Sequence, residues 1–342
     1  MNMISLAEYR VLPDYLVRFG IRQLLKKRLF DEQATDVESN GLRYRDLLDE
    51  LEQSPIAIET ETTNEQHYEV PAEFFRYVLG KHLKYSACLW DEQTNNLDLA
   101  EEQMLNLYLQ RAELADHQKI LELGCGWGSL TLWMAQRFPN SRITAVSNSN
   151  SQREFIQQRA MELGLSNIEV ITCDVNQLTI ERRFDRIVSV EMFEHMRNYQ
   201  SLLKRIADWL MPEGKLFVHI FCHRYLAYPF ETEGNDNWMG RYFFSGGLMP
   251  ARYTLLHFQE HLRLESQWDV SGIHYQKTAE AWLNNMDGCH DEILALFNGN
   301  YGRKQARLWL QRWRIFFMAC AELFGYRTGN EWMVSHYRFA KV

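Results

Sequence analysis

This chain of 342 residues lacks several patterns that would assign it to a familiar class of protein. No apolar run approaches the roughly 20 residues that a membrane-spanning helix needs, so a transmembrane protein is not expected. The first residues show no secretory signal pattern, and the six cysteines are scattered without a C-x-x-C pair. We therefore expect reduced thiols and a cytoplasmic location. The eleven histidines include no H-E-x-x-H or similar pattern, so no metal ion is expected.

The chain also lacks an excess of positive charge. Its net charge of −8 argues against a general nucleic-acid binder, whose binding domain would be basic. A local basic group, made of Arg22, Lys26, Lys27 and Arg28, lies on an amphipathic helix expected near residues 15–29. A solvated helix face explains this group, and weak membrane-surface contact is the alternative. The sequence leaves open a homodimer.

The stretch from residue 118 to residue 135 is the most informative local pattern. A short apolar strand is predicted at 118–123, three glycines follow at positions 124, 126 and 128, and an apolar stripe of helical period begins at Leu130. Glycine allows the backbone to turn with positive φ and lets a ligand lie against the main chain. The free N–H groups of the following helix point toward the same place. The order of strand, glycine turn and helix therefore predicts a ligand-binding turn.

The spacing of this turn distinguishes two ligand classes. Ser129 stands where the dinucleotide pattern G-x-G-x-x-G requires its third glycine. The pattern G-x-G-x-G preceded by Glu122 instead resembles motif I of the class I S-adenosylmethionine-dependent methyltransferases. S-adenosylmethionine, the methyl donor that this resemblance implies, presents an ammonium, a carboxylate, two ribose hydroxyls and an adenine edge. A carboxylate beside the turn, such as Glu122, suits the ammonium.

Further strands are predicted at 142–146, 168–172, 184–190 and 215–221, each followed by a helix or a loop. Polar residues follow three strand ends: Asn148, Asp174 and Glu191. Because the carboxyl ends of parallel strands meet at one edge, we expect these residues to lie along one crevice. A strand near 265–274, helices at 278–296 and 301–323, and a strand at 332–340 would supply a closing antiparallel pair. The predicted fold is α/β, a Rossmann-like, doubly wound, seven-stranded sheet.

Two regions lie outside this alternating pattern. Residues 1–105 contain helical stripes and are expected to form an N-terminal cap, with the polar segment 59–71 as a candidate lid. Residues 106–342 are expected to form the methyltransferase core. Within the core, an aromatic-rich insertion at about 222–262 is either ordinary packing or the wall of an acceptor pocket.

The segment from Glu191 to Met196, Glu-Met-Phe-Glu-His-Met, carries the candidate catalytic groups. If a helix begins where the fourth strand ends, Glu191, Glu194 and His195 stand at i, i+3 and i+4 and share one face. Two carboxylates and an imidazole can bind a cationic amine and remove its proton, which frees the lone pair that attacks a methyl group. The alternative is that the glutamates complement a helix N-terminus and His195 packs.

Several segments are similar to the plant coclaurine N-methyltransferases, which belong to the cyclopropane fatty acid synthase superfamily. The similar segments run from about residue 14 to the end of the chain and include 68–71, 121–128, 148–156, 190–196, 321–326 and 331–333. The resemblance implies catalytic roles for Glu194 and His195, with Glu191 in support. It also implies donor contacts at Tyr85, Ser86, Gly124, Gly126, Asn148, Gln152, Asp174 and Val175.

Some residues depart from the plant pattern. Trp127 stands where the plant enzymes have glutamine, Ala87 replaces a cysteine, and His219 and Tyr275 are similar to residues of the lipid-modifying branch. The interpretation that we favour is methyl transfer to the nitrogen of a small, aromatic-bearing amine similar to coclaurine or another tetrahydroisoquinoline, with His195 accepting the ammonium proton. The first alternative is methylation of an unsaturated lipid acyl chain, as in cyclopropane fatty acid synthases. A regulator that binds an adenosyl ligand without catalysis is the second.

Overall fold

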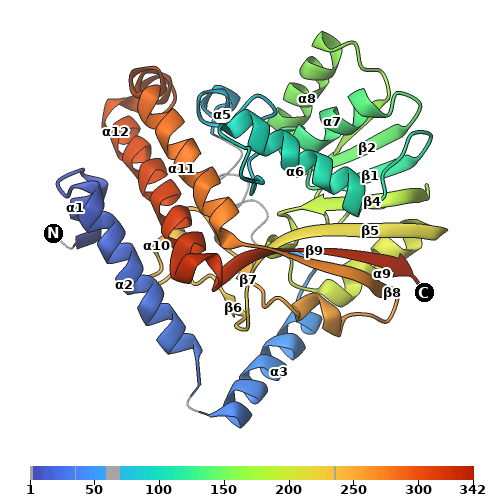
Figure 1. The fold of residues 1–342 in the computed structure, drawn as a ribbon, viewed down its shortest axis with the longest axis horizontal. Coiled ribbons are helices and arrows are strands. Elements are labelled where there is room, and N and C mark those ends of the chain that lie inside the picture. Colours follow the sequence, from blue (N-terminus) through green and yellow to red (C-terminus); the bar gives the residue numbers. More distant parts are fainter. Residues whose placement is uncertain (1–2, 35, 59–69, 235) are drawn as a thin grey trace.

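The protein is built around a seven-stranded sheet with the strand order β3-β2-β1-β4-β5-β9-β8 (Figure 1). The computed structural model describes residues 3–34, 36–58, 70–234 and 236–342. The strands are β1 (Lys119–Leu123), β2 (Arg142–Ser147), β3 (Ile168–Thr172), β4 (Phe184–Val190), β5 (Leu210–His223), β8 (Leu262–Val270) and β9 (Trp332–Lys341). The first five pair in parallel, whereas β9 runs antiparallel to both β5 and β8. This sheet confirms the predicted fold class.

Helices cover both faces of the sheet. Successive side chains of a strand point to opposite faces, so the apolar side chains of the buried strands need a partner layer on each side. In β1, Ile120 packs into the core beside the helices α6 and α7, while Leu121 packs into a second core that includes α9 and α3. The helices that flank the parallel strands are α6 (Leu97–Arg111), α7 (Ser129–Arg137), α8 (Asn150–Glu162) and α9 (Tyr199–Trp209). The central strands β1 and β2 are therefore buried on both sides, whereas the edge strand β3 is only partly buried. The carboxyl ends of the parallel strands meet at one edge of the sheet.

A helical layer lies beside the sheet (Figure 1). It combines the N-terminal helices with a hairpin inserted between β8 and β9. Its members are α1 (Met3–Glu8), α2 (Asp14–Glu32), α5 (Ala72–Val78), α11 (Gly272–Gly288) and α12 (His290–Gly325). The helix α3 (Val37–Gln53) instead packs with α9 in the second core. Ion pairs join distant parts of this layer: Arg18 of α2 reaches Glu280 at 2.6 Å and Glu322 at 3.1 Å. Arg314 of α12, nearly buried, likewise reaches Asp14 at 2.7 Å.

The predicted boundary between the strand at 265–274 and the helix at 278–296 is wrong by several residues. The strand β8 ends at Val270, and Ser271 caps α11 by accepting a hydrogen bond from the N–H of Ile273. Gly272 begins the helix where a Cβ atom would lie 2.2 Å from the carbonyl oxygen of Trp332. The close approach of the last strand thus decides where this helix begins, and a local pattern cannot show it.

The aromatic insertion forms short elements over the sheet edge. These are β6 (Tyr228–Pro229), α10 (Trp238–Tyr242), β7 (Leu248–Met249) and the 3-10 turn η2 (Thr254–His257). Phe243 stacks on Phe316 of α12 with 4.3 Å between ring centroids, so the insertion is fixed to the helical layer. Most of the predicted lid, residues 59–69, lies outside the described residues.

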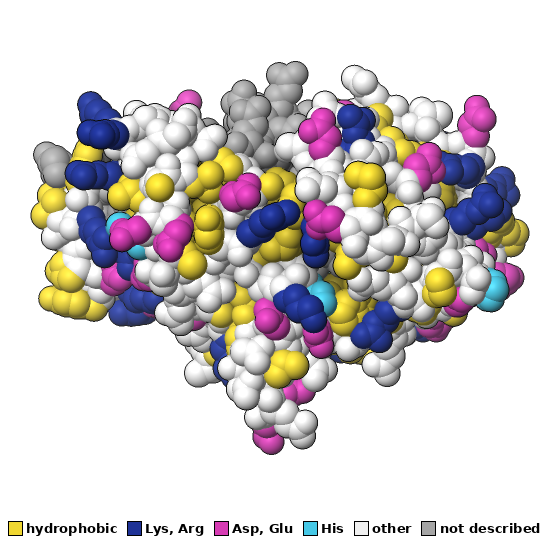
Figure 2. Space-filling view, turned by 90° about the horizontal axis from the view of Figure 1, so that it is seen from above, with side chains coloured by type: hydrophobic (Ala, Val, Ile, Leu, Met, Phe, Trp, Pro, Cys, Tyr) yellow, Lys and Arg dark blue, Asp and Glu magenta, His cyan; other side chains and the backbone are white. Residues whose placement is uncertain are grey.

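Positive side chains on the face in Figure 2 are interspersed with acidic ones. On α2, Arg22 pairs with Glu322 at 2.7 Å, and Lys27 and Arg28 pair with Asp31 and Glu32. These pairs fit the solvated-face interpretation of the basic group. In the described part of the chain no helix is both long and apolar enough to cross a membrane. The described residues likewise include no group of three or more His, Cys, Asp or Glu side chains that could hold a metal ion.

Candidate active site

The glycine turn joins β1 to α7 at the carboxyl edge of the sheet. Gly126 has a φ of 51°, and a Cβ atom added there would meet no other atom within 4 Å. By contrast, a Cβ atom on Gly124 would lie 2.7 Å from Cγ of Met192. The main chain at Gly126 therefore borders open space, and a ligand can lie directly against it.

Two adjoining cavities meet at this turn. The first cavity is lined by Asn148, Asp174 and Val175, and the second by Tyr85, Ser86 and Glu122. Four residues line both: Gly124, Gly126, Gln152 and Glu191. The structure thus brings together every residue predicted to contact the donor, from strand ends and from the loop before α6.

A buried amide in this site is incompletely satisfied by the protein. The carbonyl oxygen of Gln152 accepts a hydrogen bond from the hydroxyl of Ser147 at 2.6 Å. Its amide nitrogen is buried and has no hydrogen-bond partner among the described residues. Since buried polar atoms in proteins are almost always paired, this nitrogen indicates a ligand that offers an acceptor. A nucleoside with hydroxyl and carboxylate groups, such as S-adenosylmethionine, fits that requirement.

Glu122 is the carboxyl group nearest the start of the turn. It is buried, and its Oε2 atom accepts a hydrogen bond from the Thr131 hydroxyl at 2.5 Å. Burial raises the pKa of Glu122 to about 8, because a carboxylate loses hydration inside the protein. The group is therefore suited to bind an ammonium ion, whose charge would stabilise the carboxylate.

The predicted helical face of Glu191, Glu194 and His195 is wrong. β4 ends at Val190, and the only helical piece here is the 3-10 turn η1 (Phe193–His195). Glu191 has a φ of 47°, in the left-handed region that non-glycine residues rarely adopt. Its N–H donates to the carbonyl of His219 at 2.9 Å, which continues the pairing with β5 for one more residue. The three residues therefore do not share the face of a regular helix, although Glu191 and His195 still line the same cavity.

The side chain of Glu191 is held by donors from three directions. Its Oε1 atom accepts from the N–H of Ala87 at 2.9 Å and lies 2.9 Å from Nε2 of His219. Its Oε2 atom accepts from the Tyr275 hydroxyl at 2.7 Å. Burial raises the pKa of Glu191, while the nearby Lys84 ammonium and these hydrogen bonds oppose that rise.

Glu194 lies deeper and is fully buried. Its Oε1 atom accepts from the N–H of Phe221 at 2.6 Å, and Oε2 has no hydrogen-bond partner among the described residues. Burial and then the charge of Glu191 raise the pKa of Glu194 well above its usual value. The two carboxyl groups form a coupled acidic pair, in which one proton is retained more tightly than in water.

The imidazole of His195 lines the first cavity with Glu191. It stacks on the ring of Phe244, with 5.0 Å between centroids and an interplanar angle of 13°. Phe244 belongs to the aromatic insertion, so the insertion determines the plane of this imidazole.

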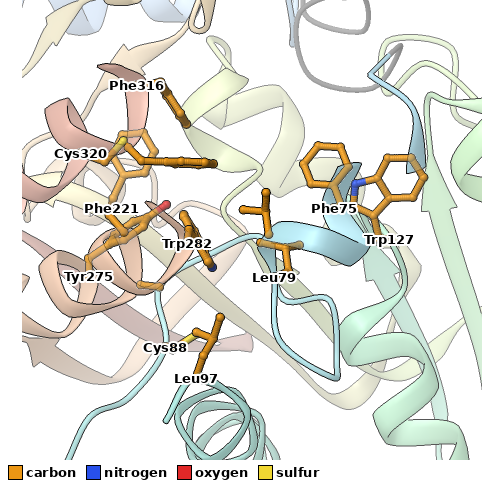
Figure 3. Close-up of a cluster of buried hydrophobic side chains, with 14 of the residues drawn as sticks. Phe75, Leu79, Cys88, Leu97, Trp127, Phe221, Tyr275, Trp282, Phe316 and Cys320 are labelled. Carbon is orange, nitrogen blue, oxygen red and sulfur yellow. The ribbon is translucent and has the colours of Figure 1, made fainter. Parts of the chain in front are cut away.

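More aromatic side chains gather beside the acidic pair (Figure 3). Phe221, Tyr275, Trp282 and Phe316, from β5, α11 and α12, lie together in this cluster. Phe75 and Trp127 approach each other on the side of the glycine turn, 5.0 Å between centroids. The cluster therefore connects the donor turn with the helical layer through aromatic surfaces.

Sequence reasoning did not assign several polar residues behind Glu191. Lys84, Tyr108 and His336 are buried there, and Arg111 lies at the edge of the group. His219 and His336 stand directly opposite each other in β5 and β9. Their facing positions depend on the register of the two strands, so no local signal could have paired them.

The fold and this site define a class I S-adenosylmethionine-dependent methyltransferase. The sequence model of the mycolic acid cyclopropane synthetase family matches residues 57–332, so the chain belongs to that family. It is 38% identical to the (S)-coclaurine N-methyltransferase of Thalictrum flavum subsp. glaucum, an alignment that covers 100% of this chain and 96% of the relative.

Two solved structures are similar to the chain. A crystal structure of coclaurine N-methyltransferase bound to N-methylheliamine and SAH has a TM-score of 0.96, is 37% identical and covers 99% of both chains. A cyclopropane synthase from Mycobacterium tuberculosis has a TM-score of 0.70 at 20% identity and covers 84% of this chain and 100% of its own; at that identity it shows the fold alone. The predicted family resemblance and the methyl donor are confirmed.

Proposed function

We propose that this chain transfers the methyl group of S-adenosylmethionine to the nitrogen of a small, aromatic-bearing amine. The acceptor would be similar to coclaurine, the compound in the name of its plant relative. The observation that carries this proposal is the placement of the Glu191 carboxyl group and the His195 imidazole in the first donor cavity, with the Glu194 carboxyl group fully buried and interacting with Glu191.

The acidic pair suits a cationic acceptor. Most alkylamines are protonated at neutral pH, and such a cation would favour the ionised form of a buried carboxyl group whose pKa burial has raised. The Oε2 atom of Glu194, which the described residues leave without a hydrogen bond, retains the capacity to accept one. A neutral lipid chain offers no charge to match this pair.

The methyl group that S-adenosylmethionine supplies is electrophilic, so the acceptor nitrogen needs a free lone pair. His195 is the group that we assign to remove the ammonium proton. Its ring is held in one plane by Phe244, while Glu191 is fixed by Ala87, His219 and Tyr275. The active-site residues then act mainly by aligning the amine nitrogen with the methyl group of the donor. Attack of a neutral amine on that methyl group disperses positive charge and creates no anion that the site would have to stabilise.

The aromatic cluster favours an acceptor with rings. Trp282 lies 5.5 Å from Tyr85, and Tyr275 stacks on Phe324 with 4.1 Å between centroids. Such rings bury flat apolar surface and also attract a cation through their faces. Of these rings Tyr85 lines the second donor cavity, and this aromatic surface supports an amine that carries an aromatic group over a simple alkylamine.

The test is product identification by mass spectrometry. The purified chain is incubated with isotopically labelled S-adenosylmethionine and, in separate reactions, with a panel of tetrahydroisoquinolines, simple alkylamines and vesicles of unsaturated phospholipid. Label on the nitrogen of a ring-bearing amine is the expected result. Label in the acyl chains of the phospholipid, with none on any amine, would overturn the proposal in favour of the lipid reaction.

A homodimer, weak membrane-surface contact and a cytoplasmic location stay predictions.

A further inference from the structure

A buried chain of hydrogen-bonding groups runs from Arg111 to the active-site carboxylate. Nη1 of Arg111 lies 2.7 Å from Nδ1 of His336. Nε2 of His336 lies 2.9 Å from Nδ1 of His219. Nε2 of His219 lies 2.9 Å from Oε1 of Glu191. Both imidazoles are fully buried, so water cannot replace any link between them.

The hydrogen bonds from Arg111 to Glu191 can be assigned donors and acceptors in only one consistent way. A guanidinium group has donors and no acceptor, so Nδ1 of His336 must accept from Arg111. A neutral His336 then carries its hydrogen on Nε2 and donates to Nδ1 of His219. His219 in turn carries its hydrogen on Nε2, which faces Glu191. The Tyr108 hydroxyl also lies 2.8 Å from Nδ1 of His219, so in this assignment it shares the single lone pair of that nitrogen with the N–H of His336.

Both histidines are neutral in this environment. Burial lowers the pKa of His219 and of His336 well below the usual value, and the Lys84 and Arg111 charges lower them further. Each imidazole therefore has one donor and one acceptor nitrogen. The hydrogen-bond partners of each imidazole therefore determine which of its two nitrogens carries the hydrogen.

We propose that Arg111 is a positioning residue that sets the tautomers of His336 and His219, so that His219 presents an N–H group to Glu191. The catalytic consequence rests on the proposed function, in which Glu191 lies beside the acceptor. With the opposite tautomer, a nitrogen lone pair of His219 would face the carboxylate, and Glu191 would rotate away or take up a proton. Arg111 thus acts at a distance, through two side chains.

The charged and titratable groups around this chain come from several elements. Lys84, in the loop before α6, donates to the Ser86 hydroxyl and to the carbonyl of Ala87, each at 2.6 Å. Tyr108 and Arg111 lie on α6, and Tyr275 lies on α11. Three further groups affect the pKa values here: Glu194, which interacts with Glu191, and the buried Cys88 and Glu101, which act on Lys84. Arg111 is the donor at the outer end of this chain.

Three variants test the proposal. Arg111→Met removes the donor to His336, and Arg111→Lys keeps both a donor and the charge. Arg338→Met is the matched control, because Arg338 lies over the same Trp268 ring as Arg111, with 5.6 Å to the centroid against 5.1 Å for Arg111. The recorded contacts of Arg338 are with Glu113, Glu265 and the Arg111 carbonyl, and none is with His336.

The direct measurement is the tautomer. Two-bond ¹H–¹⁵N correlation spectra of the ¹⁵N-histidine-labelled protein separate the two ring nitrogens, and His219→Asn and His336→Gln variants assign the signals. In the wild type, Arg111→Lys and Arg338→Met we expect hydrogen on Nε2 of both residues. In Arg111→Met we expect His336 or His219 to shift toward the Nδ1–H form. Hydrogen on Nδ1 of His219 in the wild type, or an unchanged tautomer in a folded Arg111→Met protein, would overturn the proposal.

The kinetic measurement shows whether the tautomer affects Glu191. With an amine that the chain methylates, Arg111→Met should lower kcat roughly 10- to 100-fold, as for loss of a residue that orients a functional group. Arg111→Met should also move the acidic limb of the pH dependence of kcat/KM to higher pH, while its donor affinity stays unchanged. Arg111→Lys should show the pH dependence of the wild type. Shifted tautomers without any change in the pH profile would refute the catalytic part. Because the spectra need no substrate, they decide the tautomer even if no amine is methylated.

Discussion

Replacing Glu122 by glutamine changes how many protons are exchanged when the donor binds. The carboxyl group of Glu122 is buried, and its pKa is about 8. Roughly nine in ten such groups therefore carry a proton at pH 7. If the donor places its ammonium beside Glu122, binding favours the carboxylate, and about 0.9 proton leaves each site. Glutamine cannot lose this proton, so the Glu122→Gln protein should release about 0.9 fewer protons per site than the wild type.

Calorimetric titration with S-adenosylhomocysteine measures this release, because that product keeps the same ammonium and carboxylate. Titrations at pH 7 in buffers of different ionisation enthalpy give the proton count from the change in apparent binding heat. The affinity of the wild type should also rise by up to about tenfold per pH unit until the pH reaches about 8, because a proton must leave for the donor to bind. The variant should show a flatter profile.

Glu101→Gln is the matched control for this experiment. Glu101 is also a buried carboxyl group, and burial raises its pKa to about 7. It accepts hydrogen bonds from the N–H groups of Gly80, His82 and Lys84. It lines neither donor cavity, so its variant should release as many protons as the wild type. Equal release by the wild type and by Glu122→Gln would refute the contact between Glu122 and the donor ammonium.

Four other substitutions give separate expectations. Gly126→Val should abolish donor binding in calorimetry, because the valine side chain fills the open space at the turn. Gly164 also has positive φ and open space around it, so Gly164→Val is the control and should bind the donor normally. Equal donor affinities of the two variants would mean that the donor lies elsewhere. Asp174→Ala should weaken donor binding by about 1–3 kcal/mol and leave acceptor affinity largely unchanged; a loss confined to the acceptor would contradict its placement. His195→Ala should slow methyl transfer by roughly 10²–10⁴-fold, with partial recovery at alkaline pH where solvent deprotonates the amine; equal impairment at every pH would exclude amine deprotonation by this residue. Phe244→Leu should lower kcat while donor affinity is kept, because the His195 ring loses its stacking partner; an unchanged kcat would show that this stacking is not needed.

The positions of the parallel strands along the chain and the glycine turn could be predicted from the sequence because the signals are local. Apolar runs, the glycines from Gly124 onward and the polar residues after each strand are visible within a few positions of one another. Parallel strands then bring their carboxyl ends to one edge whatever the details of packing. For this reason Asn148, Asp174 and Glu191 could be predicted to share a crevice although 26 positions separate the first two.

The conformation at Glu191 could not be predicted in this way. The spacing of Glu191, Glu194 and His195 is helical, yet the N–H of Glu191 pairs with the carbonyl of His219 on a neighbouring strand. That long-range hydrogen bond extends the β pairing and forces a turn with positive φ. Pairing between strands therefore overrides the local helical preference at this position.

The sequence by itself determined the donor turn, the class of sheet and the residue types available for proton removal, because each depends on neighbours in the chain. Only the tertiary structure decided which groups hold Glu191. His336 contacts His219, from which it is 117 positions away in the sequence, and Tyr275 of α11 contacts Glu191, which is 84 positions away. Arg111 of α6 contacts His336 at the outer end of the hydrogen-bonded series. These contacts depend on the register of β5 with β9 and on how the helices pack on the sheet. Register and packing are properties of the whole fold, and no short stretch of sequence encodes them.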